Sequence, residues 1–232
     1  MLAFATRMAA TLSAVVPALD EERELAATLA ALSAEVDEIV VADGGSRDAT
    51  LAIARESGAR VSQGPPGRGR QLNAGAAMAR GDLLWFVHAD TRVAPGGGAR
   101  LRAAVAAGAV GGAFEIRFAA DGWRYRLGGA LASARSRRFR FFLGDQAPFA
   151  RRADYAALGG FRDWPLFEDV DFCRRLRARG PLAILTPPVA TSARRFERVG
   201  PLAGVARNWL LLLLFEMGVS PQRLARLYRA AR

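Results

Sequence analysis

The stretch DLLWFVHADTR, residues 82–92, contains an apolar run that stops abruptly at His88 and Asp90. The run at residues 83–87 is too short for a typical helix and predicts a strand buried on both faces, as in the middle of a parallel sheet. Open α/β sheets bind ligands just beyond the carboxyl ends of such strands. If the backbone stays extended, period-two alternation places His88 and Asp90 on one face, where both can reach one metal ion.

Strand and helix signals alternate on both sides of this stretch. The predicted elements of the first 118 residues are strand 12–17, helix 20–34 with Asp20 as its N-cap, strand 38–43, helix 48–57, strand 59–63, helix 71–79, strand 83–87, helix 99–107 and strand 110–118. Alternation of this kind predicts parallel strands joined by right-handed crossovers.

After residue 118 the pattern changes, because residues 123–142 mix aromatic side chains with six arginines. The elements expected there are an amphipathic helix and loop at 123–142, a turn into a strand at 144–152, helix 153–158, helix 167–179, strand 182–185 and helices 201–217 and 221–232. We therefore expect an α/β fold in which helices flank a mostly parallel central sheet. Its parts are a ligand-binding half (1–118), a second half of the same domain (119–200) and a C-terminal helical appendage (201–232).

Charge is distributed unevenly along the chain. All 33 basic residues are arginine, and the net charge is −2 over residues 1–116 but +13 over residues 117–232. A basic half attracts phosphates, nucleic acid or an anionic membrane surface. The run WLLLLLF, residues 209–215, is too short to span a membrane. With the arginines it favours a membrane-surface or lipid-linked ligand, although a solvated arginine surface over a core helix explains the pattern equally well.

Two loops carry candidate binding groups. Asp43 ends a predicted strand before Gly44-Gly45-Ser46, where a carboxylate can accept hydrogen bonds from a ribose or base, or can simply shape the turn. The loop 65–70 combines glycines with Arg68 and Arg70 just before a predicted helix, which suits a diphosphate, although an ordinary solvated loop is the alternative. No G-x-G-x-x-G follows the first strand, so a dinucleotide site of that type is disfavoured.

Acidic side chains form two further candidates. His88 and Asp90 could hold Mg²⁺ or Mn²⁺ against phosphate oxygens, and an imidazole ligand favours Mn²⁺; the alternative is a strand-end cap beside a core histidine. Glu168, Asp169 and Asp171 lie in a predicted first helical turn, where acids are also common for dipole reasons. At 100° per residue, Glu168 and Asp171 share a face and Asp169 faces away.

Taken in order, these stretches resemble the family 2 glycosyltransferases with the GT-A fold. The matching pieces are VPALDEE (16–22), VADGGSRD (41–48), NAG through ARGD (73–82) and HAD (88–90), followed by FED (167–169) in the place of the family's acidic acceptor-side motif. The match covers most of residues 12–180. Within the family the chain is most similar to a small bacterial branch with HADT and GDQ motifs, often encoded near radical-SAM proteins.

The resemblance implies roles for individual residues. Pro17, Leu19 and Glu21 would border the nucleotide base. The full set expected to bind the nucleotide sugar is Pro17, Leu19, Glu21, Asp43, Gly45, Arg68, Arg70, Asn73, Ala89 and Asp90. Asp90 would hold the metal, with His88 replacing the usual first carboxylate of the D-x-D motif. Asp169 would be the catalytic base, with Gln146 and Glu168 on the acceptor side.

We therefore expect an inverting enzyme that moves one sugar from a UDP- or GDP-sugar to a hydroxyl acceptor, with Mg²⁺ or Mn²⁺ as cofactor. The Q-x-x-R-W motif of processive synthases is absent, which favours transfer of a single sugar. The single cysteine, Cys173, excludes an intramolecular disulfide and fits a reducing cytosol. The expected location is cytoplasmic, with peripheral contact to the inner face of the membrane.

Two alternatives remain open from the sequence. A nucleotidyltransferase acting on a sugar phosphate or cofactor precursor should carry a glycine-rich loop where PALDE, residues 17–21, stands. A non-catalytic membrane or nucleic-acid binder would use the arginines alone and leave the clustered acids without a role. We expect no nucleic-acid partner.

Overall fold

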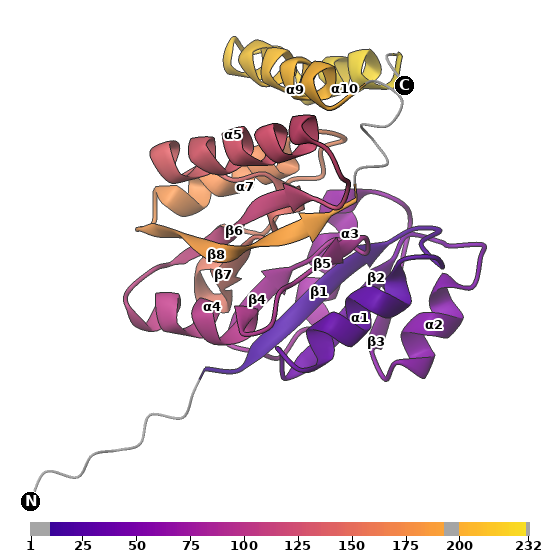
Figure 1. Ribbon diagram of the computed structural model, residues 1–232. Helices are drawn as coiled ribbons and strands as arrows, with labels where there is room; N and C mark the ends of the chain where they lie inside the picture. Colours follow the sequence, from indigo (N-terminus) through magenta and orange to yellow (C-terminus); the bar gives the residue numbers. More distant parts are fainter. Residues whose placement is uncertain (1–9, 193–199, 231–232) are drawn as a thin grey trace, which may run out of the picture.

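The computed structural model describes residues 10–192 and 200–230. Within this part of the chain an eight-stranded sheet has the strand order β3-β2-β1-β4-β7-β6-β8-β5, and helices cover it (Figure 1). The strands are β1 (Leu12–Ala18), β2 (Glu38–Asp43), β3 (Arg60–Gln63), β4 (Leu83–Phe86), β5 (Thr91–Arg92), β6 (Gly111–Phe118), β7 (Phe149–Arg151) and β8 (Leu182–Thr191). The helices are α1 (Leu25–Ser33), α2 (Thr50–Glu56), α3 (Arg68–Met78), α4 (Gly97–Ala106), α5 (Trp123–Phe139), α6 (Arg152–Ala157), α7 (Glu168–Arg177), α9 (Pro201–Glu216) and α10 (Pro221–Ala230), with a short 3₁₀ turn η1 (Gly144–Gln146).

The central strand β4 confirms the prediction from the apolar run. Its four residues are at most 2% exposed, and they alternate between two cores. Leu83 and Trp85 pack into the core that contains residues of α1, α2 and α4. Leu84 and Phe86 pack into the opposite core, with residues of α3, α6 and α7. Burial of each such side chain contributes about 1.5–3 kcal/mol, so β4 joins the two layers of helices.

The sheet is parallel in its first half and mixed in its second. β3, β2, β1 and β4 pair in parallel, as the βαβ pattern predicted. β7 then pairs antiparallel with both β4 and β6. β8 runs parallel to β6 and reaches Thr191, beyond the predicted end at 185. The β6–β8 register shifts between Phe114 and Ile116, which accommodates Pro187 and Pro188, two residues that lack ladder donors.

Two predicted helix starts were wrong. Asp20 does not cap α1, which begins at Leu25; Asp20 has a left-handed backbone (φ 53°), and its Oδ1 accepts a hydrogen bond from Arg47 N at 2.8 Å. That contact ties the loop after β1 to the loop after β2, a tertiary interaction that competes with capping. α3 begins at Arg68 rather than Gln71, so both arginines of the predicted loop lie in the first turn of a helix.

The C-terminal helices α9 and α10 lie over α5, at the upper end of the molecule in Figure 1. A separate apolar cluster joins Phe167 and Val170 of the α7 region to Leu211 of α9 and Leu224 of α10. The predicted end of the last helix, at residue 232, lies outside the described residues. Within the described ranges, none of the helices has the length and apolar character that crossing a bilayer requires.

Candidate active site

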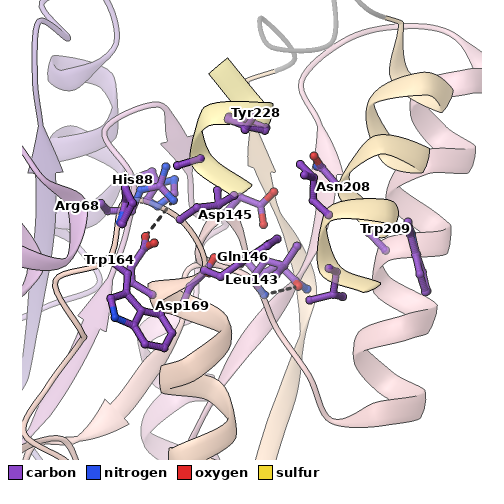
Figure 2. Close-up of a pocket in the computed structure, with 18 of the residues that line it drawn as sticks. Arg68, His88, Leu143, Asp145, Gln146, Trp164, Asp169, Asn208, Trp209 and Tyr228 are labelled. Atoms are coloured by element: carbon purple, nitrogen blue, oxygen red, sulfur yellow. Dashed lines mark hydrogen bonds and ion pairs between the residues drawn. The ribbon is translucent and has the colours of Figure 1, made fainter. Parts of the chain in front are cut away.

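A cavity of about 610 Å³, here called the large cavity, lies between the first turn of α3, α5, the amino end of α7 and the helices α9 and α10. Figure 2 shows Arg68 and His88 on one side of it, with Asn208 and Trp209 of α9 on the other. Its polar lining includes the side chains of Arg68, His88, Arg135, Asp145, Glu168 and Asp169. The tertiary fold thus gathers residues from positions 66 to 228 around one space.

Asp169 is held at this cavity by two backbone donors. Its Oδ2 accepts a hydrogen bond from Gly144 N at 2.6 Å, and its Oδ1 accepts one from Val170 N at 2.8 Å in its own helix. A Cβ on Gly144 would lie 3.1 Å from Asp169 Oδ2 and 3.3 Å from His88 Nε2. Gly144 therefore sits between these two side chains, and the absence of a side chain there lets them approach the same point.

Glu168 is buried next to Asp169 and pairs with a cation. The residue is 1% exposed, and its Oε1 lies 3.2 Å from Arg68 Nη1. Burial raises the pKa of the Glu168 carboxyl, Arg68 opposes that rise, and the neighbouring Asp169 charge adds to it. This ion pair connects the amino end of α7 to the first turn of α3.

The prediction of which acids share a face was wrong. Glu168 and Asp169 both line the large cavity, whereas Asp171 pairs with Arg175 Nη2 at 2.7 Å. The cavity lies at the amino end of α7 and not along its side. Successive residues at a helix end spread around the axis and can all face a space beyond it, so the angular rule for a helix side does not apply there.

His88 and Asp90 do share a site. Both are half-buried, and both line a second, small cavity of about 50 Å³ with Asp145, Asn208 and Tyr228. Asp145 and His88 line the large cavity as well, so the two spaces adjoin. The two side chains therefore line one space, but β4 ends at Phe86 and an extended strand does not bring them there. Joint binding of one metal ion by them stays a prediction.

The donor set around the small cavity has a defined chemistry. Among residues 10–192 and 200–230, no group of three or more His, Cys, Asp or Glu side chains forms a complete metal cage. The Asp90 carboxylate and the His88 imidazole instead suit a divalent cation that takes its remaining ligands from the phosphate oxygens of a bound molecule. His88 and Asp90 therefore fit a divalent ion held jointly with such a ligand.

The carboxyl ends of β1 and β2, residues 17–21 and 43–48, form a separate feature that we call the β1–β2 edge. Ala18 and Asp43 are register partners in the two strands. Asp43 is 1% exposed; its Oδ2 accepts hydrogen bonds from Gly45 N at 2.9 Å and Ser46 N at 3.1 Å, and Ser46 Oγ donates to its Oδ1. The turn-shaping role is thus visible in the structure, while a role in binding stays a prediction.

The other residues predicted at this edge lie beside the Asp43 turn. Pro17 and Glu21 are half-buried and Gly45 is exposed, while Leu19 is 43% exposed. Glu21 N donates to Thr50 Oγ1 at 2.8 Å, which joins the loop to α2. Neither Asp43 nor these four residues line either cavity. The structure therefore brings the predicted base-binding residues together, but at an open edge.

Gln71, which the sequence reasoning missed as a site residue, connects this edge to α3. Its Nε2 donates to Ala18 O at 2.8 Å and Ala42 O at 2.9 Å, the carbonyls at the ends of β1 and β2. The side chain thus fixes the first turn of α3 against both strands. In that turn Arg70 Nε lies 2.7 Å from Asp163 Oδ2, so both predicted diphosphate-binding arginines have an ion-pair partner.

Three other predicted residues use their polar atoms inside the protein. Asn73 Oδ1 accepts hydrogen bonds from Tyr155 Oη at 2.6 Å and Phe161 N at 2.9 Å, and Asn73 lines neither cavity. Gln146, fully buried, donates from Nε2 to Phe114 O at 3.0 Å. The Ala89 carbonyl accepts from Thr28 Oγ1 at 2.6 Å. Their positions support the shape of the site, and direct binding by them stays a prediction.

Several lining residues were not foreseen. Arg135 lines the large cavity, and its Nη2 donates to Gln146 Oε1 at 3.1 Å. Its Nε is buried without a hydrogen-bond partner in the described structure, and burial lowers the pKa of this guanidinium. No sequence signal separates Arg135 from the five other arginines of residues 123–142. The lining residues from α9 and α10 likewise arrive only through tertiary packing.

Comparison with known proteins identifies the class. Residues 13–161 match the family model described as glycosyl transferase family 2. Because this match covers more than half of the chain, the protein belongs to that family. The expected GT-A fold is confirmed by the solved structures that it resembles.

The similar curated proteins are glucosyl-3-phosphoglycerate synthases. That of Mycolicibacterium paratuberculosis is 36% identical over 99 residues, which cover 37% of this chain and 30% of the relative. That of Mycobacterium tuberculosis is 34% identical over 99 residues, covering 37% and 31%. The aligned part therefore spans about a third of the length of these relatives.

Solved structures cover more of the chain. Glucosyl-3-phosphoglycerate synthase from Mycobacterium tuberculosis, in complex with Mn²⁺, UDP and glucosyl-3-phosphoglycerate, has a TM-score of 0.56 at 25% identity, covering 79% of this chain and 70% of the other. Residues 1–349 of TarS from S. aureus give a TM-score of 0.58 at 19% identity, covering 85% and 63%. The TarS likeness concerns the fold alone.

Proposed function

We propose that this protein transfers a single sugar from a nucleotide-diphosphate sugar to a hydroxyl acceptor, with inversion at the anomeric carbon. The observation that carries the proposal is the position of Asp169, at a cavity beside the carboxyl end of the central strand and across Gly144 from His88. Membership of glycosyl transferase family 2 supports it.

Asp169 has the geometry of a general base. Its two backbone hydrogen bonds hold the carboxylate in place, and a carboxylate has about four lone-pair positions, so acceptor sites remain for a substrate hydroxyl. Asp169 takes the proton from that hydroxyl as the oxygen attacks the anomeric carbon from the side opposite the leaving diphosphate. A base positioned in this way contributes on the order of 10² to 10⁴ in rate.

The leaving diphosphate lies, in this proposal, between the first turn of α3 and the carboxyl end of β4. Arg68, Arg70 and the amides of that turn supply positive charge where negative charge develops. Arg68 Nη1 lies 3.2 Å from Glu168 Oε1. The same guanidinium would therefore contact both the diphosphate and an acid on the acceptor side. A divalent ion bound by His88 and Asp90 would neutralise diphosphate charge, and the imidazole ligand favours Mn²⁺.

The β1–β2 edge receives the nucleoside in this assignment. Pro17, Leu19 and Glu21 border the base, and Asp43 with Gly45 contacts the ribose or base. The related synthase from Mycobacterium tuberculosis was solved with UDP, which favours a UDP-sugar over a GDP-sugar as donor. We accordingly assign donor binding to residues 1–118 and acceptor binding to residues 119–200 together with the C-terminal helices.

A thermal-shift panel tests this function. The panel contains UDP-glucose, UDP-N-acetylglucosamine, GDP-mannose, ATP and CTP, each with and without Mn²⁺. A UDP-sugar with Mn²⁺ should stabilise the folded protein by about 2.7 kcal/mol at 100 times its Kd, and Asp169→Asn should keep this shift. Stabilisation by ATP or CTP without any response to nucleotide sugars would instead support a nucleotidyltransferase and overturn the proposal.

A further inference from the structure

Helix α5 presents an apolar stripe to solvent. Trp123, Leu127 and Leu131 are spaced four residues apart and are 59%, 41% and 48% exposed. The opposite face of the helix packs on β6, where Ser133 Oγ contacts the Ile116 backbone. The stripe is therefore not the buried face of an amphipathic helix, but a second apolar face with no covering element among the described residues.

Arginines border this stripe on both sides. α5 contains five arginines and no acid. At 100° per residue, Arg124 falls on one side of the stripe and Arg126 and Arg137 on the other, while Arg138 falls within the arc of the stripe, beyond its C-terminal end. All four are exposed. Arg137 pairs with Glu115, whereas no acid of the described residues lies within ion-pair distance of the other three. An apolar strip flanked by cations is typical of a helix that lies in a membrane interface.

The neighbouring helix α9 extends the apolar surface. Trp209, Leu210 and Leu213 are 46%, 56% and 56% exposed, and Met217 just after the helix is 72% exposed. α9 packs against α5, since a Cβ on Gly128 would lie 3.8 Å from Val205 Cγ2. Among the described residues, every exposed large apolar side chain except Leu19 lies on or directly after α5, α9 or α10.

Charge distinguishes two partners that could cover this apolar surface, a second copy of the chain and a lipid bilayer. A second copy of the chain would place the arginines of α5 against those of its partner, because α5 offers no acid to pair with them. An anionic lipid surface accommodates both features, since lipid headgroups complement the guanidiniums and acyl chains take the apolar stripe. The net charge of +13 on residues 117–232 also favours an anionic lipid surface.

The exposed surface continues into the large cavity. Trp209 is 46% exposed and also lines that cavity. Val205, Leu211, Leu212 and Ala225 add apolar side chains to its lining, and Figure 2 shows Trp209 on the side away from Arg68 and His88. A compound with a hydroxyl group toward Asp169 and an apolar part toward α9 would match both sides of this space.

We propose that α5 and α9 dock on an anionic lipid bilayer, and that the large cavity receives from this side a hydroxyl acceptor with an apolar tail. The second part rests on the function proposed above; the docking surface does not.

Flotation with liposomes tests the docking surface. The full chain should float with vesicles of phosphatidylcholine containing 30% phosphatidylglycerol and not with phosphatidylcholine alone, and 0.5 M NaCl should reduce the bound fraction. The double variants Leu127→Ser/Leu131→Ser and Arg124→Gln/Arg126→Gln should each lower the bound fraction at least fivefold. Arg55→Gln/Arg100→Gln, which removes two exposed arginines from the other half, should bind like wild type.

Several outcomes would overturn the docking surface. The first is a lack of flotation of wild type at low salt, and the second is vesicle binding by the α5 variants equal to that of wild type. The third is concentration-dependent dimerisation without vesicle binding, which would assign the surface to a second copy of the chain. Circular dichroism of each variant verifies that it folds. If vesicle binding is found while no nucleotide sugar shifts the melting temperature, the docking surface stands and the proposed function falls.

A matched pair of small alcohols tests the acceptor class. Below its micellar concentration, hexyl β-D-glucoside should bind at least tenfold more tightly than methyl β-D-glucoside in the presence of UDP and Mn²⁺, because the two differ only in alkyl length. Leu212→Asn should remove the difference in affinity between the two glucosides without altering the shift in melting temperature that UDP and Mn²⁺ cause. Equal binding of both glucosides by wild type would exclude an acceptor with an apolar tail.

Discussion

The β1–β2 edge and the large cavity are constructed in opposite ways. Asp43 accepts its hydrogen bonds from residues two and three positions further along the chain, so its turn is a local structure. The large cavity takes its lining from positions 66 to 228, and its acids depend on partners such as Arg68 and Gly144. A local turn can be inferred from consecutive residues, whereas the cavity exists only in the folded chain.

The largest expected effect is on the rate of sugar transfer, and it distinguishes the catalytic step from binding of the donor. Asp169→Asn should lower the rate of sugar transfer by at least 10²-fold, because an amide cannot take the acceptor proton, while the shift with UDP-sugar and Mn²⁺ remains. Release of UDP, measured at saturating donor, reports the rate. Asp171→Asn is the matched control, since Asp171 occupies the same helix but does not line the cavity. Near-normal turnover of a folded Asp169→Asn protein would show that another group is the base.

The second effect tests the carboxyl end of the central strand. Asp90→Ala should reduce UDP-sugar affinity in Mn²⁺ at least tenfold, about 1.4 kcal/mol, and EDTA should have the same effect on wild type. Calorimetric titration with and without Mn²⁺ measures both. Asp82→Asn provides the control because Asp82 precedes β4 and its carboxylate accepts hydrogen bonds only from Thr11 in the described structure. Metal-independent binding by wild type would contradict this assignment.

The third prediction concerns the β1–β2 edge, where one carboxylate serves both the fold and, in our proposal, the ligand. Asp43→Ala leaves two backbone N–H groups and a hydroxyl without their acceptor, so the free energy of unfolding should fall by about 1–3 kcal/mol. Urea denaturation measures this loss. Binding of UDP to the folded fraction should also weaken. In Asp48→Ala, which changes a neighbouring turn carboxylate, UDP binding should stay unchanged; weakening there as well would indicate that turn shape alone matters.

The smallest expected effect is the pH dependence of the Glu168–Arg68 pair. Because the pKa of Glu168 is raised in the folded protein, the folded state holds this proton more strongly than the unfolded state. The stability linked to Glu168 is therefore complete below its unfolded pKa and is lost as pH rises through the folded pKa. Between pH 4 and pH 7 the free energy of unfolding of Glu168→Gln should fall less than that of wild type. The difference between the two proteins should be smaller than the loss expected for Asp43→Ala. Glu56→Gln, an exposed acid, should follow the wild-type curve; identical curves for all three proteins would exclude the shift.

Sequence patterns predicted the parallel half of the sheet well. The apolar run at residues 83–87 and the β-α-β-α order at residues 12–57 both reflect periodicities that burial imposes on consecutive residues. Patterns were less informative where distant groups compete. Asp20 resembles a helix cap but bonds to Arg47 instead, and the short strand β5 is too brief to produce a periodic signal. The turn into a strand expected at 144–152 is present as η1 and β7, but its antiparallel pairing was not predicted.

For the site, the sequence by itself determined which residues we propose to carry the chemistry: the carboxylates at the ends of strands and at the start of α7, and the arginines of the first turn of α3. It did so because such residues follow local structural signals. The tertiary structure alone decided that Glu168 and Asp169 share a cavity while Asp171 does not, and that Gly144 separates Asp169 from His88. It also decided that α9 and α10 add apolar side chains to the lining of that cavity. These relations join residues as far apart in the sequence as Pro66 and Tyr228, and the distances between them depend on how the layers pack rather than on any periodicity of the sequence.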